Sequence, residues 1–371
     1  MQVRVKDIVK IMEDHFPPHL AESWDNVGLQ IGSYDMPVHR ILTTLDLDAG
    51  ILAQAVEQDV DLIITHHPLF FKGIKTIRFE EEKGRFIQTL IKADICVYSA
   101  HTNLDSAARG LNQILAEKLG LTKIQPLMKN KTEELYKLVI YVPCGHEEPL
   151  RQAVNDAGAG HTGLYSDCSF RTIGTGTFKP GTGTHPFIGE EGKVAEVEEY
   201  RLETIVPKDK LPQVLTRMKQ VHPYEEVAYD LFLLQNEGQI FSLGRKGQLE
   251  EPVSLEELCR HVKKVLGLKN LRVVGNMERA IKKIAVVSGA GMSLMSAALA
   301  KNCDVLITGD LKYHEARDAE SAGLAIIDAG HFGTESLVAE YLAELLEQAF
   351  EEYAYEVEVV PVTGCDCISI Y

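Results

Sequence analysis

Histidine and carboxylate side chains gather at three places in this 371-residue sequence, each directly after a short apolar run. Imidazoles and carboxylates together suit a divalent first-row metal such as zinc, iron, manganese or nickel. Because one tetrahedral site uses only four ligands, this set favours two metal ions that share a bridging carboxylate and a water. The residues are His66 and His67, His101 and Asp105, and His331 and Glu335.

The apolar runs in front of these residues predict the buried strands of an α/β fold. They are rich in β-branched residues and almost continuously apolar, which is typical of strands covered on both faces. All candidate ligands then lie past the carboxyl ends of strands, where open α/β sheets bind their ligands. The six runs span residues 41–48, 61–68, 94–101, 283–291, 303–310 and 324–331.

Helical patterns between the runs should hold the carboxylates in place. We expect Thr334 to cap the helix that follows it, with Glu335 in the first turn, where an anion is favoured. Asp105 should likewise begin a long helix. Asp46 and Asp310 lie near the same sheet edge and could support the ligands. The other helical patterns cover residues 49–59, 84–94, 292–302 and 312–321, besides an amphipathic helix at the N-terminus.

The two end regions of the chain repeat each other. An offset of 243 residues aligns Asp61 with Asp304, and an offset of 230 aligns Asp105 with Glu335, each preceded by a histidine four residues earlier. We interpret this as a duplicated β/α unit whose copies are related by a pseudo-twofold. The alternative is a strand–helix rhythm that α/β proteins share by chance.

The middle of the chain has a different, ferredoxin-like order of elements, β-α-β-β-α-β. The strands are expected at 135–143, near 168–178, 197–206 and 226–235, and the helices at 146–157 and 208–221. The Gly/Thr-rich residues 172–193 should form a mobile loop. We predict a first half of the metal-binding domain at 1–126, an insert at 127–245 and a second half at 246–371.

Charge and cysteine content exclude several classes of protein. The net charge of −16 disfavours binding to nucleic acid or to an anionic membrane, because phosphate affinity comes mainly from positive charge. Seven scattered cysteines without a CxxC motif are typical of a reducing cytosol. No signal-peptide core and no run of membrane-spanning length occurs in the sequence. We expect a cytoplasmic protein.

Four other motifs carry weaker signals. Gly158–Gly163 matches GxGxxG but follows a helix, so a tight turn is favoured over dinucleotide binding. Cys365 and Cys367 would share one face of a strand, where core packing is favoured over metal binding. Ser288–Gly291 could cradle an anion or simply enter a helix. His222–Glu226 could form an interface, a small-ligand element or a turn.

Four separated motifs resemble the Ngg-interacting-factor-three family, whose bacterial members are called GTP cyclohydrolase 1 type 2 homologues. The motifs are Ala21–Gly32, Ile64–Phe70, Ser99–Asp105 and Gly330–Glu335. The resemblance covers the whole chain, which is similar to the long, YqfO-type members.

This resemblance implies a dinuclear metal site, an insert and an assembly. Glu335 would be the bridging ligand, with His101 close by. The insert would be related to the PII and CutA regulatory proteins, and the chain would form a toroidal homohexamer, a trimer of dimers. The metal ligands at matching positions would be His66, His67, Asp105, His331 and Glu335.

Three functions compete at this stage. The first is a metal-dependent hydrolase that uses a metal-bound hydroxide on an unidentified small molecule, with zinc as the first candidate metal and His101 as the candidate proton shuttle. The family name points to hydrolytic ring opening of GTP. The second is a metal-handling or small-molecule-sensing regulatory protein, and the third and weakest is a toroidal scaffold for nucleic acid or protein.

Overall fold

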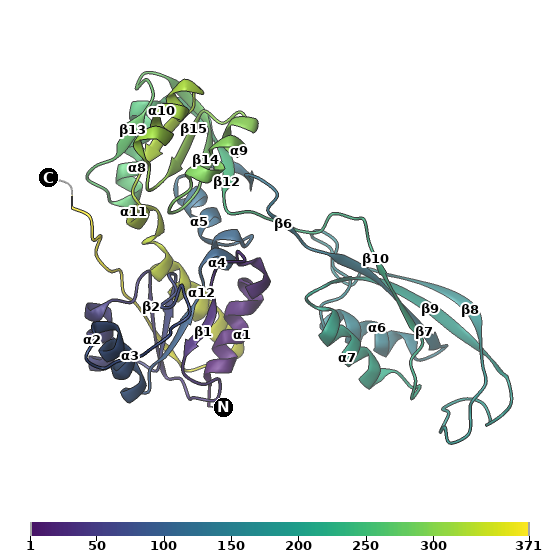
Figure 1. Cartoon of the computed structure of the whole chain (residues 1–371). Coiled ribbons are helices and arrows are strands. Elements are labelled where there is room, and N and C mark those ends of the chain that lie inside the picture. The colour runs from purple at the N-terminus through teal and green to yellow at the C-terminus, as the bar shows by residue number, and fades with distance from the viewer. Residues whose placement is uncertain (1, 370–371) are drawn as a thin grey trace. The chain divides into compact units, whose positions relative to one another are not determined.

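Four β-sheets organise residues 2–369, the part of the chain described by this computed structural model (Figure 1). The contacts divide the chain into two compact units. Thr132–Ile240 form one unit, and the residues before and after this segment together form the other. The pair β6 (Lys131–Thr132) and β11 (Ile240–Phe241) marks the connection between them. Within residues 2–369, no helix is long and apolar enough to cross a membrane.

The discontinuous unit contains a five-stranded sheet in the order β1-β4-β3-β2-β17. Its strands β17, β2, β3 and β4 are parallel, and β1 is antiparallel to β4. Helices α2 and α3 pack on one face through apolar side chains, and α1 and α12 pack on the other. The strands are Gly28–Ile31 (β1), Arg40–Thr44 (β2), Leu62–Thr65 (β3), Cys96–Ser99 (β4) and Glu358–Pro361 (β17). The helices are Val5–His15 (α1), Ala49–Glu57 (α2), Glu82–Lys92 (α3) and Val338–Tyr353 (α12), with a short turn at Pro18–Leu20 (η1).

A six-stranded sheet in the same unit has the order β13-β16-β15-β14-β12-β5. Strands β14, β15 and β16 are parallel, as β2, β3 and β4 are. Helices α9 and α10 cover one face, and α5 and α8 cover the other. The strands are Thr122–Pro126 (β5), Arg245–Ser254 (β12), Arg272–Val274 (β13), Ala280–Val286 (β14), Val305–Thr308 (β15) and Ala325–Asp328 (β16). The helices are Leu111–Lys118 (α5), Leu255–Leu266 (α8), Met295–Ala300 (α9, after the turn η2 at Met292–Leu294) and Tyr313–Ser321 (α10).

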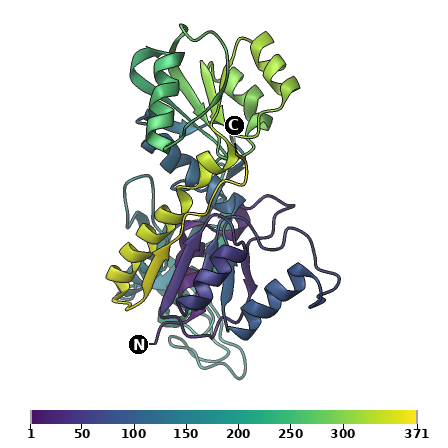
Figure 2. The same cartoon turned by 90° about the vertical axis from the view of Figure 1, so that its left-hand side faces the viewer.

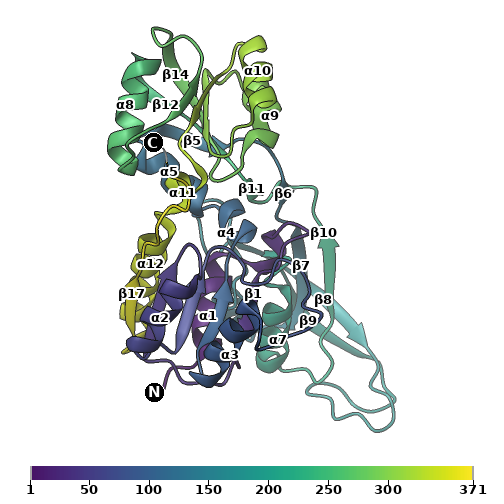
Figure 3. The ribbon, with the colours of Figure 1, turned by 60° about the vertical axis from the view of Figure 1, so that its left-hand side comes forward.

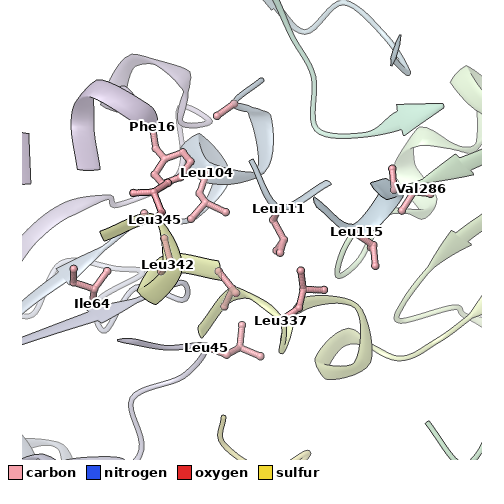
Figure 4. Packing of buried hydrophobic residues seen from close by; sticks show 14 of the residues in the cluster. Phe16, Leu45, Ile64, Leu104, Leu111, Leu115, Val286, Leu337, Leu342 and Leu345 are labelled. Atoms are coloured by element: carbon pink, nitrogen blue, oxygen red, sulfur yellow. The ribbon is translucent and has the colours of Figure 1, made fainter. Parts of the chain in front are cut away.

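One hydrophobic cluster joins the two sheets of this unit, and α12 runs through it (Figure 2). Leu342 and Leu345 of α12 lie beside Phe16 and Leu104, as Figure 4 shows, and Leu337 lies on the side of α5. All of these side chains are buried. Because interiors pack as densely as organic crystals, this shared core fixes the strand ends of one sheet relative to those of the other.

Two short helices carry the predicted carboxylates, and this corrects the expected helix starts. Asp105 lies near the end of α4 (Thr102–Ser106), and Glu335 ends α11 (His331–Glu335), before the long helices begin (Figure 3). The Thr334 hydroxyl donates to the carbonyls of Gly330 and His331, which precede it, so it does not cap α12. Both carboxylates are therefore held by an isolated helical turn between the two sheets.

The other unit, Thr132–Ile240, is an antiparallel sheet in the order β10-β7-β9-β8 with two helices. Buried side chains of α6 and α7 pack on one face of the sheet. In chain order the elements are β7 (Leu135–Pro143), α6 (Glu147–Asp156), β8 (Ser169–Phe178), β9 (Ala195–Pro207), α7 (Leu211–Val221) and β10 (Tyr229–Leu233). The expected order β-α-β-β-α-β is therefore present. The expected insert spans 127–245. Its first residues, 127–131, and its last, 241–245, belong by their contacts to the discontinuous unit.

Part of the predicted mobile loop is a strand. Residues 172–178 belong to β8, which pairs with β9 along its whole length, and only 179–194 connect the two strands. Gly176 has a specific role here, because a β-carbon would lie 2.1 Å from a carboxylate oxygen of Glu199. Cys365 and Cys367 also differ from expectation: both are exposed and follow the last strand, β17, so neither packs in the core.

His222, from the motif singled out above, is a buried structural histidine in this second unit. Its Nε2 donates to the Tyr141 carbonyl at 3.0 Å, and its Nδ1 accepts from the Tyr224 amide at 3.1 Å. Burial lowers the pKa of His222, so the folded state binds fewer protons than the unfolded state below about pH 6.5. The stability that it contributes is present above that pH and is lost as the pH falls through the folded-state pKa.

We therefore expect the urea midpoint of the parent chain to fall between about pH 7.5 and about pH 5.5 by more than that of His222→Gln. Urea unfolding of both proteins at the two pH values, followed by circular dichroism, tests this. The exposed His161 supplies the control, since His161→Gln should keep the pH dependence of the parent. Equal pH dependence of the parent and His222→Gln would contradict the assignment.

Candidate metal centre

The structure brings all six predicted site residues together at the facing ends of the two sheets. His66 and His67 follow β3, and His101 follows β4 at the start of α4. The ring centres of His66 and His101 lie 5.1 Å apart, and those of His67 and His331 lie 5.3 Å apart. Each half of the discontinuous unit thus supplies ligands to one cluster, which neither half could form alone.

Glu335 lies at the centre of a row of alternating carboxylates and imidazoles. Its Oε2 lies 3.1 Å from Nε2 of His67 and 3.0 Å from Nε2 of His331. On the far side of each ring, Nδ1 bonds a second carboxylate, Asp46 at 2.7 Å and Asp310 at 2.8 Å. Since an ionised carboxylate only accepts, each Nδ1 carries a proton and each Nε2 is directed at Glu335. This is the outer support that metal-binding histidines usually have.

The charged forms of Glu335 and its two neighbouring histidines stabilise one another. Burial opposes ionisation of Glu335, but the bonds from His331 and His67 lower its pKa below the usual value. Burial likewise opposes the charged form of His67, yet its bonds to Asp46 and Glu335 raise its pKa to about 10. The bond to Glu335 is the main cause that raises the pKa of His331 to about 9. Protons on the two imidazoles or a metal ion between these atoms can supply the positive charge.

His66 has a buried nitrogen with no hydrogen-bond partner among residues 2–369. Its Nδ1 donates to the Ala100 carbonyl at 2.9 Å, which leaves the lone pair on Nε2. Burial lowers the pKa of His66 to about 3, so the ring stays neutral. Its Nε2 lies 3.7 Å from Oδ1 of Asp105 and 4.0 Å from Oε1 of Glu335. A neutral lone pair directed at two carboxylates fits a metal ligand, because a bound cation would satisfy all three groups.

Two overlapping sets of ligand atoms occur in the cluster. One set is His66, His67 and His101, and the other is His67, His331 and Glu335; within each set the atoms lie within 4.8 Å of one another. The first set includes His101, the candidate proton shuttle. Asp105 lies outside both sets, beside His66, and burial together with the charge of Glu335 raises its pKa to about 7.

Asp25 is a site residue that sequence reasoning missed. Its buried carboxylate accepts from Nδ1 of His101 at 2.9 Å and from the backbone N and Oγ1 of Thr102 at 3.0 and 2.5 Å. Burial opposes ionisation, but the bonds from His101 and Thr102 lower the pKa of Asp25 to about 2. Asp25 therefore orients His101 as Asp46 and Asp310 orient the other two histidines.

The backbone around the site is fixed by buried polar groups. Asp328 accepts from the amides of Leu311 and Gly330, the neighbours of Asp310 and His331. Ser288 donates to Asp105 at 3.3 Å, so the Ser288–Gly291 motif supports a carboxylate instead of cradling a free anion. Together these bonds hold the loops that present the ligands.

The chain matches a known protein family over almost its whole length. A family described as Duf34/NIF3 (NGG1p interacting factor 3) matches residues 3–364. The chain belongs to this family. Two NIF3 relatives named GTP cyclohydrolase 1 type 2 homolog are 43% identical over 353 residues (Halalkalibacterium halodurans, 95% of each chain) and 42% identical over 330 residues (Bacillus subtilis, 89% of this chain and 88% of the relative).

Solved NIF3 structures share the fold. The crystal structure of a Bacillus cereus protein related to NIF3 superposes with a TM-score of 0.93 at 38% identity, over 100% of both chains. Staphylococcus aureus protein SA1388 gives a TM-score of 0.77 at 29% identity, over 100% of this chain and 99% of its own. The mixed α/β architecture with several sheets is therefore that of the family.

Proposed function

We propose that this chain is a dinuclear metal-dependent hydrolase that acts on a nucleotide or a related small molecule. The observation that supports this proposal most is the pair of overlapping ligand sets, with His67 common to both and Glu335 between His67 and His331. One ion held by each set would use five of the six candidate ligands, and the sixth, Asp105, has its Oδ1 3.7 Å from Nε2 of His66 beside the first set. Zinc is the first candidate metal, and iron, manganese and nickel also suit these ligands.

The residues of the chain would divide the chemistry between them. Two bound ions supply a lowered pKa for a coordinated water and positive charge to stabilise an oxyanion. Asp46 and Asp310 keep His67 and His331 in the orientation that ligands need. His101, oriented by Asp25, either completes the first ligand set or exchanges a proton at Nε2, as the sequence analysis proposed.

The names of the relatives suggest the substrate. Both relatives described above are called GTP cyclohydrolase 1 type 2 homolog, and hydrolytic attack at C8 of the purine would be the corresponding reaction. We take GTP as the first substrate to test.

The wider architecture is also part of the proposal. The matching order of parallel strands in the two sheets supports a duplicated metal-binding domain interrupted by the unit Thr132–Ile240. The β-α-β-β-α-β order of that unit supports a PII/CutA-like insert. A homohexamer remains the proposed assembly, and the seven free cysteines support a cytoplasmic location.

Metal content and turnover test the function together. We expect elemental analysis of the purified protein to find two divalent ions per chain. Hydrolytic ring opening of GTP should be lost after treatment with a chelator and restored by added zinc. The matched control is the same protein dialysed without chelator. Two ions without turnover on any nucleotide or phosphoester would favour the metal-handling or sensing function, and fewer than one ion would contradict the proposal.

A further inference from the structure

Two large, exposed aromatic side chains contact the ring of His101. Trp24 is 60% exposed and Phe71 is 50% exposed. Both rings meet the His101 ring edge to face, Trp24 at 5.9 Å and 72° and Phe71 at 5.6 Å and 89° between ring centres and planes. Core packing does not explain why aromatic residues occupy these positions, because an exposed ring gains little free energy from burial.

The backbone that carries the two rings is anchored by adjacent residues. Asn26 donates to the Phe70 carbonyl at 2.6 Å, and the Phe70 amide donates to Gln30 at 3.0 Å. Asp25, between Trp24 and Asn26, holds His101. Three consecutive residues thus supply the first aromatic ring, orient the histidine that both rings contact, and anchor the residue before Phe71.

Positive charge follows Phe71 directly. Residues 71–79 contain Lys72, Lys75 and Arg78 and no carboxylate, in a chain whose net charge is −16. Lys72 and Lys75 form no ion pair within residues 2–369, whereas Arg78 pairs with Glu81 at 3.5 Å, one of three glutamates at 80–82. The two unpaired lysines favour an anionic group of a ligand beside Phe71.

We propose that Trp24 and Phe71 form a ring-binding subsite that holds a planar heterocycle with an anionic group, the chemistry of a nucleotide, beside His101. Aromatic side chains bind nucleobases by stacking on their π-faces. The proposal rests on the proposed function only in placing the reaction at the neighbouring metal centre. Binding of the ring itself requires neither metal nor turnover.

The protein contains its own reporter for this subsite, because Trp24 is the only tryptophan in the chain. With selective tryptophan excitation, guanosine 5′-monophosphate should quench the fluorescence saturably. Guanosine should quench with lower affinity, and ribose 5-phosphate, which lacks the ring, should leave the emission unchanged. The titrations are made with metal-free full-length protein and repeated with zinc-loaded protein.

Two exposed phenylalanines provide a matched pair of variants. Phe71→Ala should weaken quenching by guanosine 5′-monophosphate roughly tenfold or more, the loss expected for one base–aromatic stack. Phe79→Ala removes a ring that is 53% exposed in the same segment and should bind like the parent. Circular dichroism and metal content should be unchanged in both variants.

Three results would overturn the subsite. They are the absence of quenching by guanosine 5′-monophosphate, equal quenching by ribose 5-phosphate, and equal affinities of Phe71→Ala and Phe79→Ala. If Phe71→Ala instead changed the oligomeric state in sedimentation velocity and left quenching intact, a second copy of the chain would be the occupant. Quenching without GTP hydrolysis would contradict the proposed reaction alone, whereas metal-dependent hydrolysis without quenching would contradict the subsite alone.

Discussion

Glu335→Gln is expected to lose metal from both ligand sets while the fold stays intact, because Glu335 belongs to one set and its Oε1 lies 4.0 Å from Nε2 of His66 in the other. The amide has nearly the same shape, so the surrounding packing is kept, but it cannot carry the charge that faces His67 and His331. Loss of an outer support alone typically costs 10–100-fold in metal affinity. We expect more than about 100-fold for this central carboxylate, and elemental analysis should find less than one ion per chain.

Position 340 supplies the control for this experiment. Glu340 is an exposed glutamate on α12, five residues further along the chain, and Glu340→Gln should keep the metal content of the parent. Asp46→Asn should give an intermediate loss, because it removes only the support of His67. Two ions per chain in Glu335→Gln would show that Glu335 is not a ligand.

Gly289→Ala should have an effect of similar size without changing any ligand. A β-carbon at position 289 would lie 2.2 Å from Oε1 of Glu335 and 3.1 Å from Nε2 of His331. The first distance is far inside van der Waals contact, so Glu335 has to leave its place between the two histidines. The backbone φ of +56° adds strain of about 1–2 kcal/mol for a residue with a side chain.

Gly267→Ala separates these two causes. Gly267 has a φ of +67° at the end of α8, but a β-carbon there would meet nothing within 4 Å. Gly267→Ala should therefore lose about 1–2 kcal/mol of stability in chemical denaturation, and Gly289→Ala should lose at least as much. Only Gly289→Ala should also lose metal by elemental analysis, and equal metal content in the two variants would contradict the tight fit around Glu335.

The central strands were predictable because they are buried on both faces. Continuous apolar runs contain β3, β4, β15 and β16, and such runs predict parallel strands that are covered on both faces. Strands β12 and β17 contain charged residues and show no clear alternation, so their existence depends on pairing partners elsewhere in the sequence.

The ends of the short helices were also not predicted, because close contacts that capping rules do not consider surround them. A β-carbon at Gly110 would lie 1.7 Å from the Leu104 carbonyl oxygen, so the chain turns back tightly on α4. Gly333 lies against Leu268, which comes from the end of another helix. Neither contact has a counterpart in the capping rules from which Thr334 and Asp105 were placed.

The candidate ligands were predictable from their residue types and their places at strand ends. The carboxylates that orient the histidines were only partly predictable. Asp46 and Asp310 lie at the same sheet edge as the ligands and were found in that way. Asp25 follows no strand and bonds to His101 from 76 residues away, so local spacing gives no sign of it. The Trp-Asp-Asn sequence within the first motif was the only available signal.

The place of α12 in the core has a consequence for the order of events during synthesis. Strand β4 ends at Ser99, but α12, which covers the same sheet, begins at Val338, about 240 residues later. At ~5–20 residues per second, a ribosome needs roughly 12–48 seconds to cover this distance. During that time the face of the first sheet that α12 completes is covered by α1 alone, and His67 lacks its contact with Glu335. Nascent chains should therefore depend on chaperones longer than their size suggests, and the ligand set of His67, His331 and Glu335 is complete only after Glu335 has left the ribosome.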